Sequence, residues 1–212
     1  MPATFFITAI RDTGYDILWN DVLCMGYKYG PDKLNFRNEE YIKGKDKKYI
    51  SSSTGHRLTD TLRLTGFEEK AEMIGLLGQF KKQTEIDYWL QMTEDEIKRL
   101  SVSKWVTIGS HSYYHNDLGK TPAIRLADDF MQSKRFLENV TGKEIRAFAF
   151  PYGSYTPEVV NEAKKAGFSQ ILATDFLFHD DKYDTTLKER FTINPFISNI
   201  NQMHANITGN YK

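Results

Sequence analysis

Two histidines lie four residues apart in the segment His-Ser-Tyr-Tyr-His at positions 111–115, directly after an apolar run typical of a strand. If the chain turns helically here, the imidazole rings of His111 and His115 share one face. Zinc binds neutral imidazole nitrogens at about 2.0–2.1 Å, and one rigid element that supplies both nitrogens keeps the ordering cost low. The pair is therefore a candidate metal site, although two structural histidines often have this spacing by chance.

The segment Phe-Ala-Phe-Pro-Tyr-Gly at positions 148–153 also lies at the end of a predicted strand. Pro151 has no N–H group, and Gly153 permits a tight turn whose amides can face an incoming ligand. Such amides can stabilise negative charge that develops on an oxygen atom. The turn is therefore a candidate oxyanion hole, and the alternative is an ordinary Pro-Tyr-Gly turn that closes a strand.

Two carboxylates near these segments are further candidates for a base or a metal ligand. They are Asp117 and Asp175. Each also has a structural interpretation, because Asp117 can cap the turn after His115 and Asp175 can simply end a strand. Two other histidines, His56 and His179, lie in polar segments, and we expect both to be exposed.

Regular elements that can position these groups begin near residue 93. The predicted order is a helix after Thr93, a strand at 105–110, a helix between Thr121 and Gly142, a strand at 145–150, a helix between Thr156 and Gly167, and a strand at 168–174. This alternation predicts a parallel sheet or a barrel. In the longest helix, the apolar side chains expected to face inward are those of Ile124, Ala127, Met131 and Leu137.

The pattern before residue 93 is less regular. Residues 3–8 form a short apolar run suited to a strand that is buried on both faces. Residues 10–92 contain many Gly, Lys, Asp and Tyr residues, including a charge run at 43–48, which predicts a long surface excursion with a solvated loop. Apolar residues at helical spacing between Phe67 and Phe80 predict an amphipathic helix that lies on the main body. Some aromatic residues of the excursion either stack on sugar rings or serve as packing, and these are Trp19, Tyr27, Tyr29 and Trp89.

The composition narrows the class of partner. The chain has 212 residues, of which 28 are basic and 28 acidic, so no net field attracts it to nucleic acid or an anionic membrane. Its single cysteine excludes an internal disulfide and leaves His, Asp and Glu as the plausible metal ligands. There is no membrane segment and no signal-peptide pattern in the first residues, so the chain as written is expected to be soluble and cytoplasmic, with a neutral partner. If a signal lies in sequence that is missing before Met1, the compartment is open. Its length fits a single domain over residues 1–212.

The two motifs, in this order, resemble the polysaccharide deacetylases of the NodB-homology family, whose second motif is His-Ser/Thr-x-x-His. The resemblance extends over residues 2–6, which look like the family's second strand, and over residues 92–174. It implies an α/β fold, namely a distorted, incomplete (β/α) barrel with its active site at the carboxyl ends of the strands. Residues 10–92 would then be a long insertion after the first strand, and residues 93–212 the core with both motifs.

The resemblance also implies roles for individual residues. His111 and His115 match the family's metal-binding histidines, and zinc is favoured over cobalt or nickel as the divalent ion. The backbone amide around Tyr152 matches the group that stabilises the oxyanion, with Pro151, Tyr152 and Gly153 against the substrate. The implied reaction is the metal-dependent hydrolysis of an acetyl group on an acetylated polysaccharide or amino sugar.

Three departures from the family pattern qualify this expectation. The family's first motif, Thr-Phe-Asp-Asp-Gly, supplies a base and a third metal ligand on the strand before the one at residues 2–6, and it is not in this sequence. We therefore expect that sequence is missing before Met1, that the barrel shows a gap or an exposed strand edge, and that this chain binds metal weakly and deacetylates slowly. Ala149 stands where many members have arginine. The late histidine that commonly acts as a general acid is represented by His204, which does not follow a clear strand.

Three functions remain to be separated. The first is a deacetylase, and the second is a catalytically impaired carbohydrate-binding or regulatory barrel that keeps the cleft and the histidine pair but lacks a base. The third is a globular domain with structural histidines, which is disfavoured because two motifs and a strand match the family in order.

Overall fold

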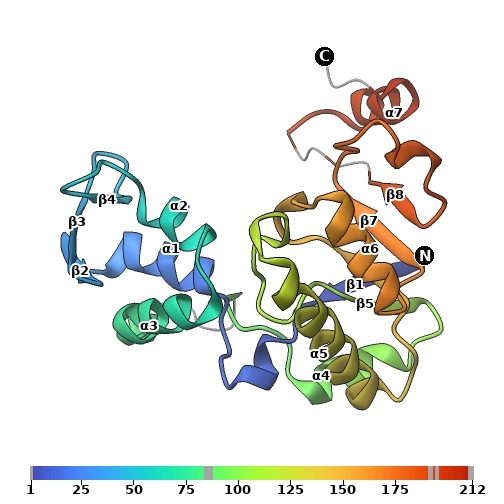
Figure 1. Ribbon diagram of the computed structural model, residues 1–212, viewed down its shortest axis with the longest axis horizontal. Coiled ribbons are helices and arrows are strands. Elements are labelled where there is room, and N and C mark those ends of the chain that lie inside the picture. Colours follow the sequence, from blue (N-terminus) through green and yellow to red (C-terminus); the bar gives the residue numbers. More distant parts are fainter. Residues whose placement is uncertain (1, 84–87, 191–192, 194–195, 210–212) are drawn as a thin grey trace.

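The computed structural model describes residues 2–83, 88–190, 193 and 196–209 (Figure 1). Its strands are β1 (Ala3–Ile7), β2 (Lys33–Phe36), β3 (Glu39–Lys43), β4 (Tyr49–Ser51), β5 (Val106–Ser110), β6 (Ala147–Ala149), β7 (Gln170–Ala173) and β8 (Leu187–Glu189). Its α-helices are α1 (Trp19–Tyr29), α2 (Leu58–Arg63), α3 (Phe67–Leu77), α4 (Glu94–Ser101), α5 (Ala123–Thr141), α6 (Pro157–Lys165) and α7 (Asn199–Thr208). Short 3-10 helices lie at Ile10–Thr13, Gly78–Gln83, Leu118–Lys120, Pro151–Gly153 and Asp181–Tyr183.

A parallel sheet forms the centre of the core. Within the described residues it has five strands in the order β1-β5-β6-β7-β8, and every pairing in it is parallel. Figure 1 shows α4, α5 and α6 packed beside this sheet. The sheet is open rather than closed, which confirms the predicted α/β fold with an incomplete barrel.

The first strand lies at an edge of this sheet. β1 pairs with β5 from Ala3 opposite Val106 to Ile7 opposite Ser110, and no other strand of the described residues pairs with it. The prediction of an exposed strand edge is confirmed, but burial on both faces was wrong, because Phe5 is 43% exposed. A strand that has a neighbour on one side only leaves part of its surface uncovered.

Local capping signals set the ends of the core helices as expected. Thr93 and Glu96 form the predicted capping box at the start of α4. The Thr156 hydroxyl accepts a hydrogen bond from the Val159 amide at the start of α6. Gly142 follows α5 with φ of +66°, a left-handed conformation that favours glycine.

The buried face of α5 differs from the prediction. Leu137 is buried as expected, but the other three residues predicted to face inward are exposed, namely Ile124, Ala127 and Met131. The helix instead turns Phe130 and Phe136 inward, and Phe130 packs edge-on against Phe148 with ring centroids 4.9 Å apart. Burying two phenylalanines removes more apolar area from water than burying Ile124 and Met131, which explains the rotation.

The excursion at 10–92 contains more regular structure than the sequence indicated. Most of it forms a second structured region, which we call the lobe (residues 15–83), at the left of Figure 1. The lobe contains α1, α2, α3 and an antiparallel sheet in the order β2-β3-β4. It has its own apolar cluster, distinct from that of the core, which includes Trp19, Tyr49, Leu62 and Met73.

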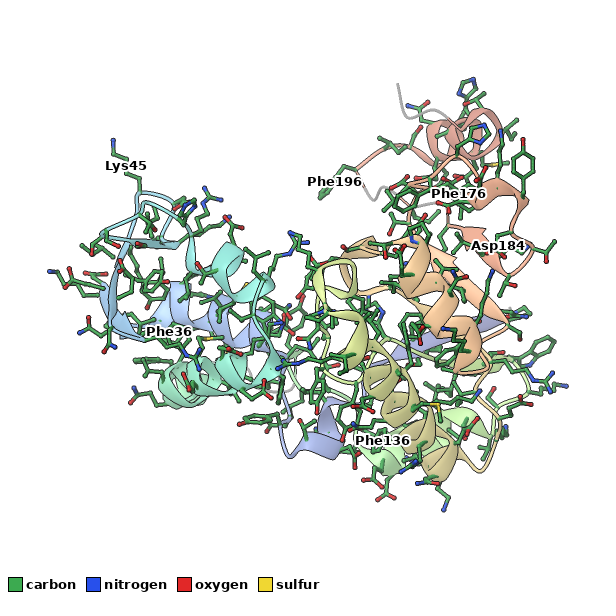
Figure 2. All side chains as sticks on the ribbon, in the orientation of Figure 1. Phe36, Lys45, Phe136, Phe176, Asp184 and Phe196 are labelled. Atoms are coloured by element: carbon green, nitrogen blue, oxygen red, sulfur yellow. The ribbon has the colours of Figure 1, made fainter. Side chains whose placement is uncertain are left out.

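The helix predicted between Phe67 and Phe80 is present as α3, but its buried residues Ile74 and Leu77 belong to the cluster of the lobe and not to the main body as predicted. Other expectations for this region hold. The charge run at 43–48 lies at a hairpin, where Lys45 extends into solvent (Figure 2). His56 is exposed as well.

The aromatic residues of the excursion serve as packing. Trp19 is 1% exposed and belongs to the cluster of the lobe. Tyr27, Tyr29 and Trp89 are partly buried and pack against the same cluster. Of the two interpretations of these side chains, the structure therefore supports packing.

None of the helices in the described residues has the length and apolar character needed to cross a membrane.

Candidate functional site

The two motif histidines meet at the carboxyl ends of the parallel strands. His111 follows β5, and its ring lies edge-on to that of His115 with centroids 5.1 Å apart. The chain between them does not turn helically, because Ser112 and His115 have φ of +71° and +55°. These left-handed residues reverse the chain tightly and bring the rings together without a helix.

Asp129 of α5 holds the turn between the histidines. Its carboxylate accepts hydrogen bonds from the backbone amides of Tyr113 at 2.9 Å and Tyr114 at 3.4 Å. The Ser112 hydroxyl accepts a third bond, at 2.8 Å, from the amide of His115. Burial raises the pKa of Asp129 to about 6. One signal was missed in the sequence, namely an acidic residue next to Phe130 on the inward face of an amphipathic helix.

The Pro-Tyr-Gly turn contacts this histidine pair. The Tyr152 hydroxyl and His115 Nδ1 are 3.1 Å apart, and the two ring centroids are 4.9 Å apart. Gly153 has φ of +64°, and a Cβ atom there would lie 2.7 Å from Thr174 Oγ1, so only glycine fits without movement. The turn thus lies beside the His115 ring.

Left-handed backbone is concentrated at this site. Ser112, His115 and Tyr152 all have positive φ, with Tyr152 at +59°. The other such non-glycine residues in the described chain lie in the hairpins of the lobe. Unfavourable backbone conformations persist only where the surroundings determine them, and they gather at functional sites.

Both imidazoles are held in the neutral form. Burial lowers the pKa of His111, and a nearby Arg190 lowers it further, against the opposing effect of a hydrogen bond to the Ala149 carbonyl. Burial also lowers the pKa of His115 to about 3, with contributions from the charges of His111 and Lys70. Burial raises the pKa of the Tyr152 hydroxyl, which stays protonated at neutral pH.

Neutral imidazoles are suited to binding a metal ion, and one ring is already oriented for it. His111 Nδ1 lies 2.7 Å from the Ala149 carbonyl oxygen, to which it donates a hydrogen bond, so Nε2 keeps a free lone pair. The described residues contain no group of three or more His, Cys, Asp or Glu side chains that could hold a metal ion. The pair therefore fits as two ligands of an ion and does not form a complete set within the described chain.

Comparison with known families agrees with this site. A family model described as polysaccharide deacetylase matches residues 77–171, a range that contains both histidines and the Pro-Tyr-Gly turn. Over these residues the chain is similar to the polysaccharide deacetylase family.

Several solved structures are similar to the chain. A polysaccharide deacetylase from Bacillus cereus is 26% identical with a TM-score of 0.48, and the match covers 56% of this chain and 37% of that one. IcaB from Ammonifex degensii is 22% identical with a TM-score of 0.43, with 50% of each chain covered. A CE4 family pseudoenzyme from Bacillus anthracis is 24% identical with a TM-score of 0.36, with 44% of this chain and 30% of that one covered. The chain thus spans half or less of the length of these structures, and a search of curated proteins found no match.

The other candidate residues, within and beyond residues 77–171, are not joined to the histidine pair by a hydrogen bond or ion pair of the described residues. Asp117 is buried and was expected to cap a turn, but its side chain makes no capping bond and instead pairs with Arg63 at 2.8 Å. Asp175 follows β7 and is exposed. His204 is exposed on α7, in a helix rather than after a strand. No hydrogen bond or ion pair among the described residues connects the Asp175 or His204 side chain to His111 or His115.

Residues of the lobe also contact the deacetylase segment, and sequence reasoning missed their contacts. They are Trp19, Arg63 and Lys70. Each of these residues is separated from its partner by at least 46 positions along the chain, so no local pattern indicates the contact. The only signal in the sequence was that their side chains can donate hydrogen bonds. Such contacts depend on how the lobe docks and not on local pattern.

Proposed function

We propose that the chain acts as a metal-dependent hydrolase that removes N-acetyl or O-acetyl groups from a polysaccharide or amino sugar. The observation that carries this proposal is the convergence of His111, His115 and the Tyr152 turn inside the segment that matches the deacetylase family. The net charge of zero is compatible with a neutral acetylated sugar as the partner.

His111 and His115 are the residues that would hold the divalent ion, with zinc favoured and cobalt or nickel as alternatives. When bound, such an ion polarises the acetyl carbonyl and lowers the pKa of a water molecule. The protein's own contribution is to keep the two nitrogens available. Burial keeps both rings neutral, and the Ala149 carbonyl fixes the ring of His111.

The Tyr152 backbone supplies the proposed oxyanion donor. In this tight turn the amides of Gly153 and Ser154 donate to the Phe150 and Pro151 carbonyls, whereas no backbone hydrogen bond of the described residues uses the Tyr152 amide. Because Pro151 has no N–H, the Tyr152 amide is the first that can donate to a ligand. A fixed donor of this kind typically contributes about 10²–10³-fold to the rate of acyl transfer.

The alternative is a carbohydrate-binding or regulatory module that does not turn over. One observation favours it, namely that the described residues show neither a third ligand nor a free carboxylate beside the pair. Asp117 is engaged by Arg63, and Asp175 is exposed. We therefore expect acetate release by this chain to be slow, because loss of a general base typically costs about 10²–10⁴-fold.

The test is acetate release from N-acetylglucosamine oligomers at high protein concentration with added zinc or cobalt. We expect slow release that is lost in His111→Ala and retained in His179→Ala, a control whose side chain is exposed beside Asp180. Binding of the oligomers and of zinc without acetate release would favour the binding module. If the chain neither binds the oligomers nor releases acetate, both functions are rejected.

A further inference from the structure

Three consecutive residues of the site are each held by a different helix of the lobe. Trp19 of α1 donates its indole N–H to the His115 carbonyl oxygen at 3.4 Å. Lys70 of α3 donates to Asn116 Oδ1 at 2.6 Å. Arg63 of α2 donates to Asp117 Oδ2 at 2.8 Å. The lobe therefore forms hydrogen bonds to the second histidine and to the two residues that follow it.

These contacts are buried, which makes them costly to break. Trp19 is 1% exposed, Lys70 0%, and the Asp117 side chain 0%. Asp117 Oδ1 has no hydrogen-bond partner in the described chain, so Arg63 supplies the closest compensation for this buried charge. Removing one member of such a pair leaves an uncompensated buried group, whereas loss of a surface pair has little effect.

The same residues also reach the Pro-Tyr-Gly turn. The Arg63 guanidinium lies over the Tyr152 ring, 4.7 Å from its centroid. Trp19 lies on the same ring with centroids 6.5 Å apart. Lys70 in turn lies 5.2 Å from the centroid of the Trp19 ring. These three side chains form one connected group that contacts both His115 and Tyr152.

Two of the residues that the lobe contacts have an unfavourable backbone. His115 and Tyr152 have φ of +55° and +59°, which L residues rarely adopt. His111, in contrast, is fixed by the core, through its amide to the Ile7 carbonyl and its ring to the Ala149 carbonyl. The lobe thus supports one half of the site, and the core supports the other half.

We propose that Trp19, Arg63 and Lys70 are positioning residues, through which the lobe fixes the His115 ring and the Tyr152 turn relative to His111. The catalytic consequence rests on the proposed deacetylase function, but the structural consequence does not. Loss of a gripping contact moves the His115 ring away from the Tyr152 hydroxyl and leaves the His111 ring in place.

Arg63→Met is the most informative variant, because Arg63 contacts both Asp117 and Tyr152 and its side chain is 34% exposed. The matched control is Arg57→Met, since Arg57 precedes the same helix and makes an exposed pair with Asp46. Trp19→Phe is a second variant, which deletes the donor to the His115 carbonyl and keeps an aromatic ring. Circular dichroism selects the variants that fold.

The first measurement is the nitrogen chemical shifts of the imidazole rings at one fixed pH. We expect the His115 signals to move in Arg63→Met and in Trp19→Phe, the His111 signals to stay, and both to stay in Arg57→Met. Unchanged His115 signals in a folded Arg63→Met, or equal shifts for both histidines, overturn the proposal. This result does not depend on whether any variant releases acetate.

The second measurement is the kinetics of acetate release where the wild-type chain is active. A misplaced Tyr152 amide lowers kcat about 10–100-fold in Arg63→Met, with KM within about twofold, because the amide stabilises the transition state more than bound substrate. A change in KM alone overturns the positioning role. If the wild-type chain releases no acetate while the ring signals shift as expected, the proposed function fails and the positioning role stands.

Discussion

The core and the lobe support the candidate site in different ways. The core fixes His111 by the backbone carbonyls of Ile7 in β1 and Ala149 in β6, the two strands that flank β5. Its position therefore follows directly from strand order. The lobe fixes the segment after His115 by side chains that come from separate helices. The comparison teaches that one histidine depends on the sheet alone, whereas the other depends on two regions packing correctly.

The largest expected effect concerns the core cluster. Phe148→Ala removes a fully buried ring that contacts Phe130, Phe150 and Phe168, and it should lower the free energy of unfolding by about 3–5 kcal/mol. Phe5→Ala, in the exposed edge strand, should cost much less. Urea unfolding measures both variants.

The same variant tests whether the two regions form one domain. We predict a single domain, so Phe148→Ala should reduce amide protection against hydrogen exchange in the lobe as well as in the core. Loss of protection confined to the core would show that the lobe folds independently, and the single-domain prediction would be wrong.

The next effect is a pH dependence of the free energy of unfolding, which comes from Lys70 of the lobe. Burial lowers the pKa of Lys70 to about 8 from its usual value near 10.5, so the folded state binds fewer protons than the unfolded state between these values. The contribution of this group to stability is therefore gained as pH rises from about 8 to about 10.5, and it is lost as pH falls through the same window. Relative to Lys70→Met, the wild-type chain should gain about 2 kcal/mol between pH 8 and 10.

Urea unfolding of both chains at several pH values gives this difference. Lys104→Met is a suitable control, because Lys104 lies over the exposed Trp105 ring and not in the buried group. A constant difference between the wild type and Lys70→Met across the window would mean that Lys70 is solvated, and the buried grip of the lobe on Asn116 would be refuted.

A smaller effect on stability is expected from replacing a glycine in each region. Gly153→Ala places a Cβ against Thr174 at a left-handed φ and should destabilise the chain by about 1–2 kcal/mol. Gly75→Ala in α3 of the lobe meets no atom within 4 Å and should stabilise it by about 0.5–1 kcal/mol. Thermal unfolding distinguishes them by sign, and equal signs would contradict the described geometry of the turn.

Local signals were enough to predict the core. The capping box at Thr93, Pro157 at a helix start and Gly142 at a helix end specify where the chain changes direction, and these signals act within a few residues. The buried face of α5 was not predictable from spacing alone, because two apolar stripes compete and packing against Phe148 selects the one with Phe130.

The lobe was missed because its signals are weak individually. The turn between β2 and β3 consists of Arg37 and Asn38 with φ of +52° and +63°, a hairpin conformation usually marked by glycine, which is absent here. Its many charged residues lie on exposed edges, and its buried residues are scattered among them. The many Gly and Lys residues therefore favoured the prediction of a surface segment, although the region contains an ordered apolar cluster.

The motif residues of the candidate site were predictable from the sequence, but the contacts that hold them in place were not. The motifs identified the two histidines and the Tyr152 turn, because their spacing and their position after strands are local properties. The path of the chain between the histidines was mispredicted, since it depends on Asp129 of α5 binding the Tyr113 and Tyr114 amides. The contacts of Arg63 and Lys70 come from distant sequence, and no local pattern indicates them.

The central claim is that His111 and His115 bind one divalent ion together, and cobalt titration tests it most directly. We predict one weakly bound cobalt ion per chain with a visible absorption band, lost in both His111→Ala and His115→Ala and retained in His204→Ala. Binding that survives removal of either motif histidine would contradict the account, because the ion would then lie elsewhere.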